Sequence, residues 1–198
     1  MGYSRAFPDA EIVGIDHEPQ PRYPFTFVRE DAYSVLRDQA WCASFDLIHA
    51  SPPCQRYSIA GRIHGSGHHP NLVPTVRYRL QKVGRPWIIE NVPGAPLHDP
   101  VMVCGLALNL GVKRHRLFES NMPLRGTTCP KGHPGVWVSV FGHAVKGRGT
   151  RDSRPDHGRG HASDAMDIDW MTLDELSEAV PPAYTHFIGS QIDYLDTW

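Results

Sequence analysis

Residues 45–58, FDLIHASPPCQRYS, constrain the fold more than any other stretch of this chain. The first five residues have the composition of a buried strand, and Pro52 and Pro53 end it, because proline fixes φ and removes two ladder donors. Cys54 follows directly. Open α/β sheets place their chemistry just beyond the carboxyl ends of strands. The stretch therefore predicts an α/β protein with a functional thiol at a strand end; for an isolated motif, a packed structural cysteine is the alternative.

Three further motifs follow this one along the chain. In order, the four are SPPCQxxSxxG at residues 51–61, ENV at 90–92, RxR at Arg114 and Arg116, and PPAYTHFIGSQI at 181–192. Together they resemble the motifs of the DNA cytosine-5 methyltransferases, and their shared order is more specific than any one of them. The resemblance implies a Rossmann-like, mostly parallel α/β sheet that binds S-adenosylmethionine. It also implies a target-recognition insertion, here short and irregular.

The resemblance assigns catalytic roles to four residues. Cys54 matches the nucleophile, which adds to C6 of cytosine and makes C5 able to accept a methyl group. Glu90, at the end of an apolar strand, would supply or share a proton at N3, because burial favours the protonated acid. Arg116, with Arg114 beside it, would bind O2, where a fixed guanidinium stabilises developing negative charge. The target base must leave the duplex for this chemistry.

Cofactor contacts are implied in the same way. Asp16 follows the apolar residues VGI and would accept hydrogen bonds from ribose hydroxyls, with Glu18 as the second candidate. A lone Asp at a strand end is otherwise a common turn residue. Asp31 matches the position that contacts the adenine amino group, and its local pattern also makes it the N-cap of a helix over residues 32–39. The remaining implied contacts are Pro52, Ser190 and Gln191.

The family's Gly-rich cofactor turn, of the FxGxG type, is not found in this sequence. In the family, this turn and its strand precede a helix such as the one expected at residues 1–7. Two interpretations stay open: Met1 is an internal methionine of a longer product, or the protein works without the segment. The first is favoured, because a missing strand would leave neighbouring parallel strands unpaired.

Charge is unevenly distributed along the chain. Residues 1–112 hold ten Lys or Arg and ten Asp or Glu, residues 113–160 hold ten and three, and residues 161–198 hold none and eight. A basic segment is what a phosphate backbone attracts, although a solvated loop is the alternative. We therefore expect double-stranded DNA as the partner. The expected DNA contacts follow the cysteine motif, in a Gly- and His-rich stretch that could form a lid: Gln55, Arg56, Ser58 and Arg62.

Length and composition favour one domain of ordinary size with its own core. We expect a catalytic core over residues 1–120, a short basic target-recognition region over 121–162, and C-terminal helices over 163–198. No apolar run approaches the roughly 18 residues of a membrane span, and no signal peptide is recognised. We expect a cytoplasmic monomer, with the short recognition region suggesting a phage or prophage origin.

The four cysteines, at positions 42, 54, 104 and 129, show no CxxC pairing. This pattern is typical of a reducing compartment. Cys129 and His133 have a ligand-like spacing, but a tetrahedral zinc site needs a second pair. We therefore expect no metal.

Local patterns predict the remaining elements. Gly84 is expected to end a helix, and Thr172 with Glu175 forms a capping box. Strands are expected at 11–15, 26–29, 86–92, 102–104, 112–120 and 137–141, and helices at 72–83, 172–179 and 184–195.

Three alternatives remain at this stage. Thiol addition at C6 also serves enzymes that act on free pyrimidine nucleotides, although the basic segment favours DNA. The missing Gly-rich turn makes a non-catalytic DNA-binding relic the second alternative. Transfer of another C5 substituent from a modified cofactor is the third.

Overall fold

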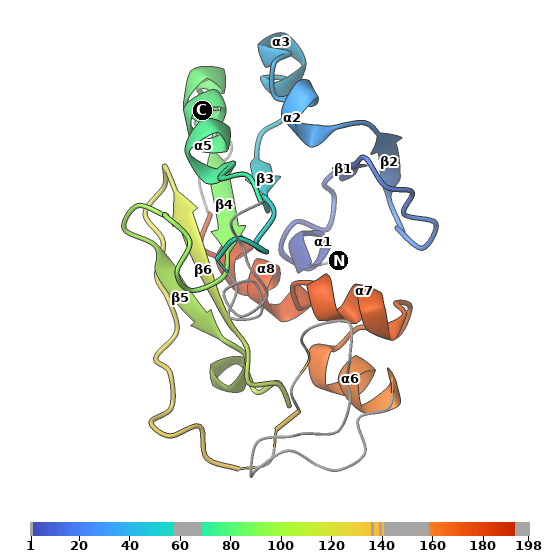
Figure 1. Ribbon diagram of the computed structural model, residues 1–198, viewed down its shortest axis with the longest axis vertical. Coiled ribbons are helices and arrows are strands. Elements are labelled where there is room, and N and C mark those ends of the chain that lie inside the picture. Colours follow the sequence, from blue (N-terminus) through green and yellow to red (C-terminus); the bar gives the residue numbers. More distant parts are fainter. Residues whose placement is uncertain (1, 58–68, 136, 139, 141–158, 193–198) are drawn as a thin grey trace. The chain divides into compact units, whose positions relative to one another are not determined.

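The computed structural model describes residues 2–57, 69–135, 137, 138, 140 and 159–192 (Figure 1). In chain order, the helices and strands are α1 (Gly2–Ala6), β1 (Val13–Asp16), β2 (Thr26–Arg29), α2 (Ala32–Val35), α3 (Gln39–Cys42), β3 (Ile48–Ala50), α5 (Val73–Val83), β4 (Trp87–Asn91), β5 (Val101–Cys104), the 3₁₀ helix η2 (Gly105–Leu108), β6 (His115–Ser120), α6 (Arg159–Met166), α7 (Leu173–Glu178) and α8 (Pro182–Gly189). Among the described residues, no helix has the length and apolar character needed to cross a membrane.

The strands form two sheets. β1 and β2 pair in parallel, whereas the larger sheet has the order β3-β4-β6-β5 and is mixed: β3 pairs with β4 in parallel, and β4 pairs with β6 antiparallel. The expected Rossmann-like, mostly parallel sheet is therefore wrong. A parallel partner for β4 would need a crossover connection, usually an α-helix. Residues 92–114 contain only turns, β5 and η2, so β6 enters the sheet beside β4 in the opposite direction.

The chain divides into two compact units. Unit 1 comprises residues 1–10, 102–115 and 126–191, and unit 2 comprises residues 11–101, 116–125 and 192–198. Each unit therefore contains segments that are far apart in the sequence. The functional boundaries expected after residues 120 and 162 stay a prediction.

The core of unit 2 lies between α5 and β4. All five residues of β4 are buried, and Val76 and Leu80 of α5 pack with Trp87 and Ile89 in one apolar cluster. The spacing of these helix residues places them on one face. Gly84 ends α5 at a φ of 73°, a left-handed conformation that glycine adopts readily. The predicted helix and its stop signal are confirmed.

A buried ion pair joins α5 to β6 within unit 2. Arg77 donates from Nε to Glu119 Oε1 at 2.5 Å and from Nη2 to Oε2 at 2.6 Å. Arg77 also donates to the Pro96 carbonyl, and the His98 amide donates to Glu119 Oε2. Both side chains are buried. Several hydrogen bonds thus satisfy the two charges that folding removes from water.

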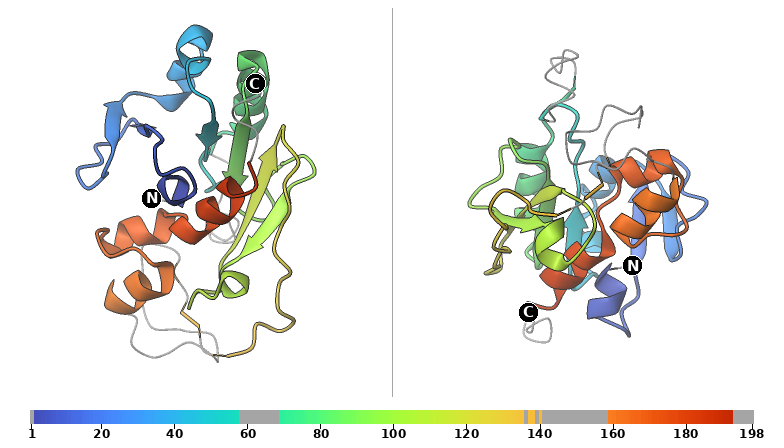
Figure 2. Two further views of the ribbon diagram at one scale, coloured as in Figure 1. Left: turned by 180° about the vertical axis from the view of Figure 1, so that it is seen from behind. Right: turned by 90° about the horizontal axis from the view of Figure 1, so that it is seen from below.

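The core of unit 1 is formed largely by its C-terminal helices. Met166 of α6 and Leu176 of α7 are fully buried and cluster with Val112. α7 begins at the predicted capping box: Thr172 accepts from the Glu175 amide, and Glu175 accepts from the Thr172 amide. α1 packs against α8, as both views in Figure 2 show.

Other predicted elements have different bounds in the structure. β2 begins and ends where predicted. The helix expected over 32–39 ends at Val35, and a second short helix, α3, begins after Asp38, whose carboxylate accepts from the Trp41 amide. β6 begins at His115, not at residue 112. α8 ends at Gly189, and residues 193–195 of its predicted extent lie outside the described residues. Of the strand expected at 137–141, the described residues show an isolated bridge from Val138 to Val112.

α6 crosses the boundary expected after residue 162. Its first half lies in the stretch that we interpreted as irregular, and RGHASDAM has weak helical periodicity and contains Gly, Ser and Asp. Its buried residues Ala162, Ala165 and Met166 pack into the core of unit 1. Tertiary packing, not local propensity, therefore stabilises this helix.

Candidate functional site

Two of the sequence motifs meet at one end of the β3-β4 pair in unit 2. The strands are parallel, with Ile48 opposite Trp87 and Ala50 opposite Ile89. Their chains therefore leave the sheet at the same end. The Pro-Pro-Cys turn follows β3 there, and Glu90 and Asn91 end β4.

Asn91 links the two motifs directly. Its Nδ2 donates to the Pro52 carbonyl at 2.8 Å, and its Oδ1 accepts from the Val92 amide at 2.9 Å. Asn91 is only 1% exposed, so both bonds are shielded from water. Sequence reasoning placed no role on Asn91. The available signal was a polar amide at the end of an otherwise apolar strand, which must find partners when buried.

Glu90 and Arg116 form an ion pair at this end of the sheet. Arg116 Nε lies 2.8 Å from Glu90 Oε1, and the exposed fractions of the two side chains are 12% and 7%. Antiparallel pairing of β4 with β6 sets Glu90 opposite Phe118 and so brings Arg116 past the end of β4. The structure thus brings together two of the four residues expected to be catalytic.

Cys54 is half-buried and forms no disulfide. Its carbonyl accepts from the Tyr57 amide at 2.9 Å, which closes a turn. Two side-chain hydrogen bonds join this turn to residues 69 and 71. Arg56 donates to the His69 carbonyl at 2.7 Å, and the Tyr57 hydroxyl donates to the Asn71 side chain. The thiol therefore lies in a turn that is anchored on both sides.

His49 of β3 is a residue that sequence reasoning passed over. Its Nε2 lies 2.9 Å from the Ser51 hydroxyl, and its ring tilts against Phe118 at 6.4 Å between centroids. Burial lowers the pKa of His49 to about 4. The imidazole is therefore neutral near pH 7. The only signal for His49 in the sequence was its position, as a polar residue in an apolar strand next to the cysteine motif.

The pKa of His49 predicts that folding stability falls in acid. As the pH falls, His49 takes up its proton near pH 6.5 in the unfolded chain, but only near pH 4 in the folded chain. Between these values the unfolded state binds more protons, so this contribution to the free energy of unfolding is complete above 6.5. It declines as the pH falls towards 4, by at most about 3 kcal/mol. Urea denaturation of the wild type and of His49→Gln across this pH range measures the effect. If the free energy of unfolding changed equally with pH in the two proteins, the prediction would be contradicted.

Arg114 has partners different from those expected. It precedes β6 and is buried in unit 1, where its guanidinium donates to the Val140 carbonyl and, at 2.8 Å, to the Ser177 carbonyl. Its own carbonyl accepts from the Tyr184 hydroxyl at 2.7 Å. The expectation that Arg114 lies beside Arg116 in a strand over residues 112–120 is corrected, because β6 begins only at His115.

The cofactor residues expected in unit 2 are held by local bonds. Asp16 ends β1 and accepts from the Glu18 amide at 2.9 Å, while 43% of its side chain stays exposed. Asp31 caps α2 with both oxygens, as its local pattern predicted. The Ser34 hydroxyl that donates to Asp31 is the largest cause lowering the pKa of this carboxyl. The Pro52 carbonyl accepts from Asn91, as described above.

The two cofactor residues expected in unit 1 follow α8. Ser190 Oγ and Gln191 Nε2 both donate to the Phe187 carbonyl at 3.0 Å. These bonds fasten the end of the helix. A cofactor role for either residue stays a prediction.

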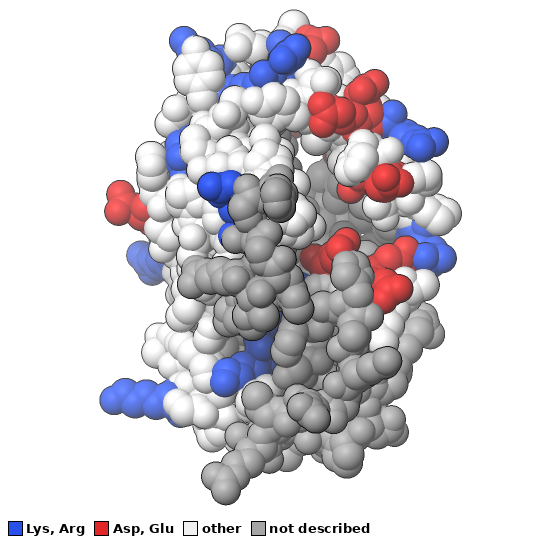
Figure 3. Space-filling view, in the orientation of Figure 1, with Lys and Arg blue, Asp and Glu red and all other residues white. Residues whose placement is uncertain are grey.

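The expected DNA contacts are only partly described. Gln55 and Arg56 are exposed beside Cys54, whereas Ser58 and Arg62 lie outside the described residues. On the face drawn in Figure 3, the Lys and Arg side chains of described residues lie in small separate groups. Residues 141–158, which hold four of the ten basic residues of the basic segment, are outside the described residues. The predicted basic interface therefore stays a prediction.

With this geometry in view, the chain was compared with known proteins. No protein-family model and no curated protein matches it.

Among the described residues, one group could hold a metal ion, and it lies in unit 1. Its members are Cys104, His115, Cys129 and His133. Burial is the largest cause lowering the pKa of His115, followed by the nearby charges of His133 and Lys113. For the Cys129 thiol, whose charged form is the deprotonated one, burial has the opposite effect and raises the pKa. Sequence reasoning noticed only Cys129 and His133, because the other pair lies on strands that are distant along the chain.

Proposed function

We propose that this protein is a DNA cytosine-5 methyltransferase. It transfers a methyl group from S-adenosylmethionine to C5 of a cytosine taken out of the duplex, through a covalent bond between Cys54 Sγ and C6 of the base. The proposal has two supports: the ordered motifs in the sequence, and the contacts that join three of them in unit 2.

The bond from Asn91 Nδ2 to the Pro52 carbonyl carries the proposal. It connects residues that are 39 positions apart, one in the ENV motif and one in the cysteine motif. The neighbouring Glu90 is paired with Arg116 of the RxR motif. A chance likeness of short motifs gives no reason for them to make contact, whereas a shared active site requires it.

The proposed chemistry begins with Cys54. Its thiolate forms the Sγ–C6 bond, and the displaced π electrons make C5 nucleophilic, with negative charge also reaching N3 and O2 of the ring. Glu90 and Arg116 are suited to stabilise that charge, Glu90 by holding a proton at N3 and Arg116 by donating to O2. Once C5 is methylated, loss of its proton to solvent returns the electron pair to the C5–C6 bond and expels the Cys54 thiolate.

Among the cofactor candidates, Asp16 fits its expected role best. S-adenosylmethionine supplies an electrophilic methyl group when bound. Asp16 keeps an exposed carboxylate at the end of β1, which suits hydrogen bonding to ribose hydroxyls. Asp31 fits less well, because both of its oxygens already accept bonds from the first turn of α2.

Methyl incorporation tests the proposal. The purified chain is incubated with S-adenosylmethionine labelled at the methyl group and with either duplex DNA or dCMP. We expect label in DNA only, recovered as 5-methylcytosine after hydrolysis. Label in dCMP would instead support action on free nucleotides. DNA binding without any incorporation would support the non-catalytic alternative.

A further inference from the structure

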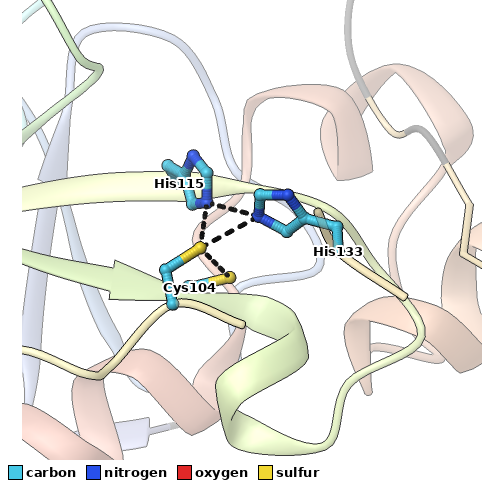
Figure 4. Close-up of side chains that lie close together, drawn as sticks. Cys104, His115 and His133 are labelled. Atoms are coloured by element: carbon cyan, nitrogen blue, oxygen red, sulfur yellow. Dashed lines mark hydrogen bonds between the residues drawn. The ribbon is translucent and has the colours of Figure 1, made fainter. Parts of the chain in front are cut away.

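A group of four side chains in unit 1 converges from three places in the sequence. Cys104 ends β5, and His115 begins β6. Cys129 and His133 lie in a turn-rich segment near the start of the third part of unit 1, which begins at Gly126. Figure 4 shows the two imidazoles and the two sulfurs directed toward one another. The ligand atoms all lie within 4.8 Å of one another.

Four distances between these atoms are close to those around a single tetrahedral metal ion. Cys129 Sγ lies 3.7 Å from Cys104 Sγ, 3.4 Å from His115 Nε2 and 3.0 Å from His133 Nε2, and the two Nε2 atoms are 3.0 Å apart. Ordinary zinc bond lengths place two sulfurs about 3.8 Å apart, a sulfur and a nitrogen about 3.6 Å apart, and two nitrogens about 3.3 Å apart. Small adjustments of these side chains would admit the ion.

We propose that Cys104, His115, Cys129 and His133 bind one Zn²⁺ ion. Two thiolates with two imidazoles are a common donor set of structural zinc sites. Soft sulfur ligands disfavour Mg²⁺ and Ca²⁺, which prefer oxygen. Four protein ligands fill a tetrahedral shell and leave no position for a substrate, so the site is structural.

The backbone around the site holds the ligands in place. The Cys104 amide donates to Thr127 Oγ1, and the Thr127 amide donates to the Met102 carbonyl, both at 2.9 Å. Gly126 allows this approach, since a Cβ there would lie 2.6 Å from the Met102 carbonyl oxygen. His133 has a φ of 48° and lies in a turn that is closed by a hydrogen bond from its backbone N–H to the Pro130 carbonyl. These bonds place the segment that carries Cys129 beside β5.

A disulfide between Cys104 and Cys129 is the competing use of these residues. It would require the sulfurs to approach from 3.7 Å to about 2.05 Å. It would also leave unexplained why two imidazoles point at Cys129 Sγ. A metal accounts for all four side chains.

Zinc at this position would fasten the segment after β6 to the ends of β5 and β6. Residues 121–133 form no helix or strand, so few backbone ladder bonds hold them. Because a metal site is assembled only in the folded chain, the free energy of metal binding adds to that of folding. Removing zinc with a chelator should therefore lower the melting temperature, whatever the enzyme activity.

Metal content tests the proposal. The full chain is purified under reducing conditions and its zinc measured by mass spectrometry; we expect about one zinc per chain. Cys129→Ala and His133→Ala are each expected to lose it. Two matched controls outside the site, Cys42→Ala and His98→Ala, are expected to keep it.

A second measurement guards against variants that do not fold. Cobalt(II) is added to metal-free wild-type protein, where tetrahedral thiolate coordination gives intense visible absorption that saturates at one equivalent. Folded wild-type protein that contains no zinc and gives no such absorption would overturn the proposal. Peptide mapping that finds a Cys104–Cys129 disulfide in folded protein purified under reducing conditions would overturn it too.

Discussion

Cys54→Ser is expected to abolish methyl transfer to DNA. The hydroxyl is a far weaker nucleophile than a thiolate, and loss of a covalent nucleophile typically lowers kcat by on the order of 10⁴-fold or more. The side chain is half-buried in an anchored turn and the change is nearly isosteric, so the melting temperature should change little. Initial rates with labelled cofactor and duplex DNA measure the effect. Cys42→Ala, in the same unit but in the core beside Leu36, is the control and should stay active.

A mechanism-based trap adds a qualitative test of the same step. In DNA that carries 5-fluorocytosine, C5 has no proton to lose after methylation, so the Sγ–C6 bond cannot break. The wild type and Cys42→Ala should form an adduct that survives denaturing electrophoresis, and Cys54→Ser should not. A trapped Cys54→Ser protein, or an active one, would remove Cys54 from the mechanism.

Glu119→Ala is expected to lower the free energy of unfolding by roughly 3–5 kcal/mol. The change leaves the guanidinium of Arg77, a residue only 6% exposed, without its carboxylate, and it deprives the His98 amide of its acceptor. Such a loss is a large fraction of the 5–15 kcal/mol that ordinarily stabilises a domain. Urea denaturation monitored by circular dichroism gives the value.

The matched control is the exposed ion pair between Arg5 and Asp167. Its atoms approach as closely, at 2.6 Å, but the side chains are 42% and 52% exposed. Arg5→Ala should therefore cost less than about 1 kcal/mol. In a further variant, Arg77→Met combined with Glu119→Leu should recover much of the loss, because no buried charge remains unpaired. Similar losses for Glu119→Ala and Arg5→Ala would show that the Arg77–Glu119 pair is not the stabilising feature proposed.

Features with local causes were predicted correctly from the sequence. The capping box of Thr172 and Glu175, the N-cap at Asp31 and the stop at Gly84 each depend on residues within four positions of one another. The extent of β2 and the buried face of α5 follow from short-range patterns as well. For such features the interacting groups are neighbours in the chain, so their spacing carries the information.

The sequence by itself therefore determined where the motifs lie, which residues begin and end several helices, and that Cys54 follows a strand end. Only the tertiary structure decided that β6 runs antiparallel to β4, that Arg116 pairs with Glu90 while Arg114 serves the core of unit 1, and that Cys104 and His115 join Cys129 and His133. The physical reason is the same in each case. These contacts join residues on separate strands and loops, and their partners are chosen by sheet pairing and by the burial of polar groups, which no local spacing records.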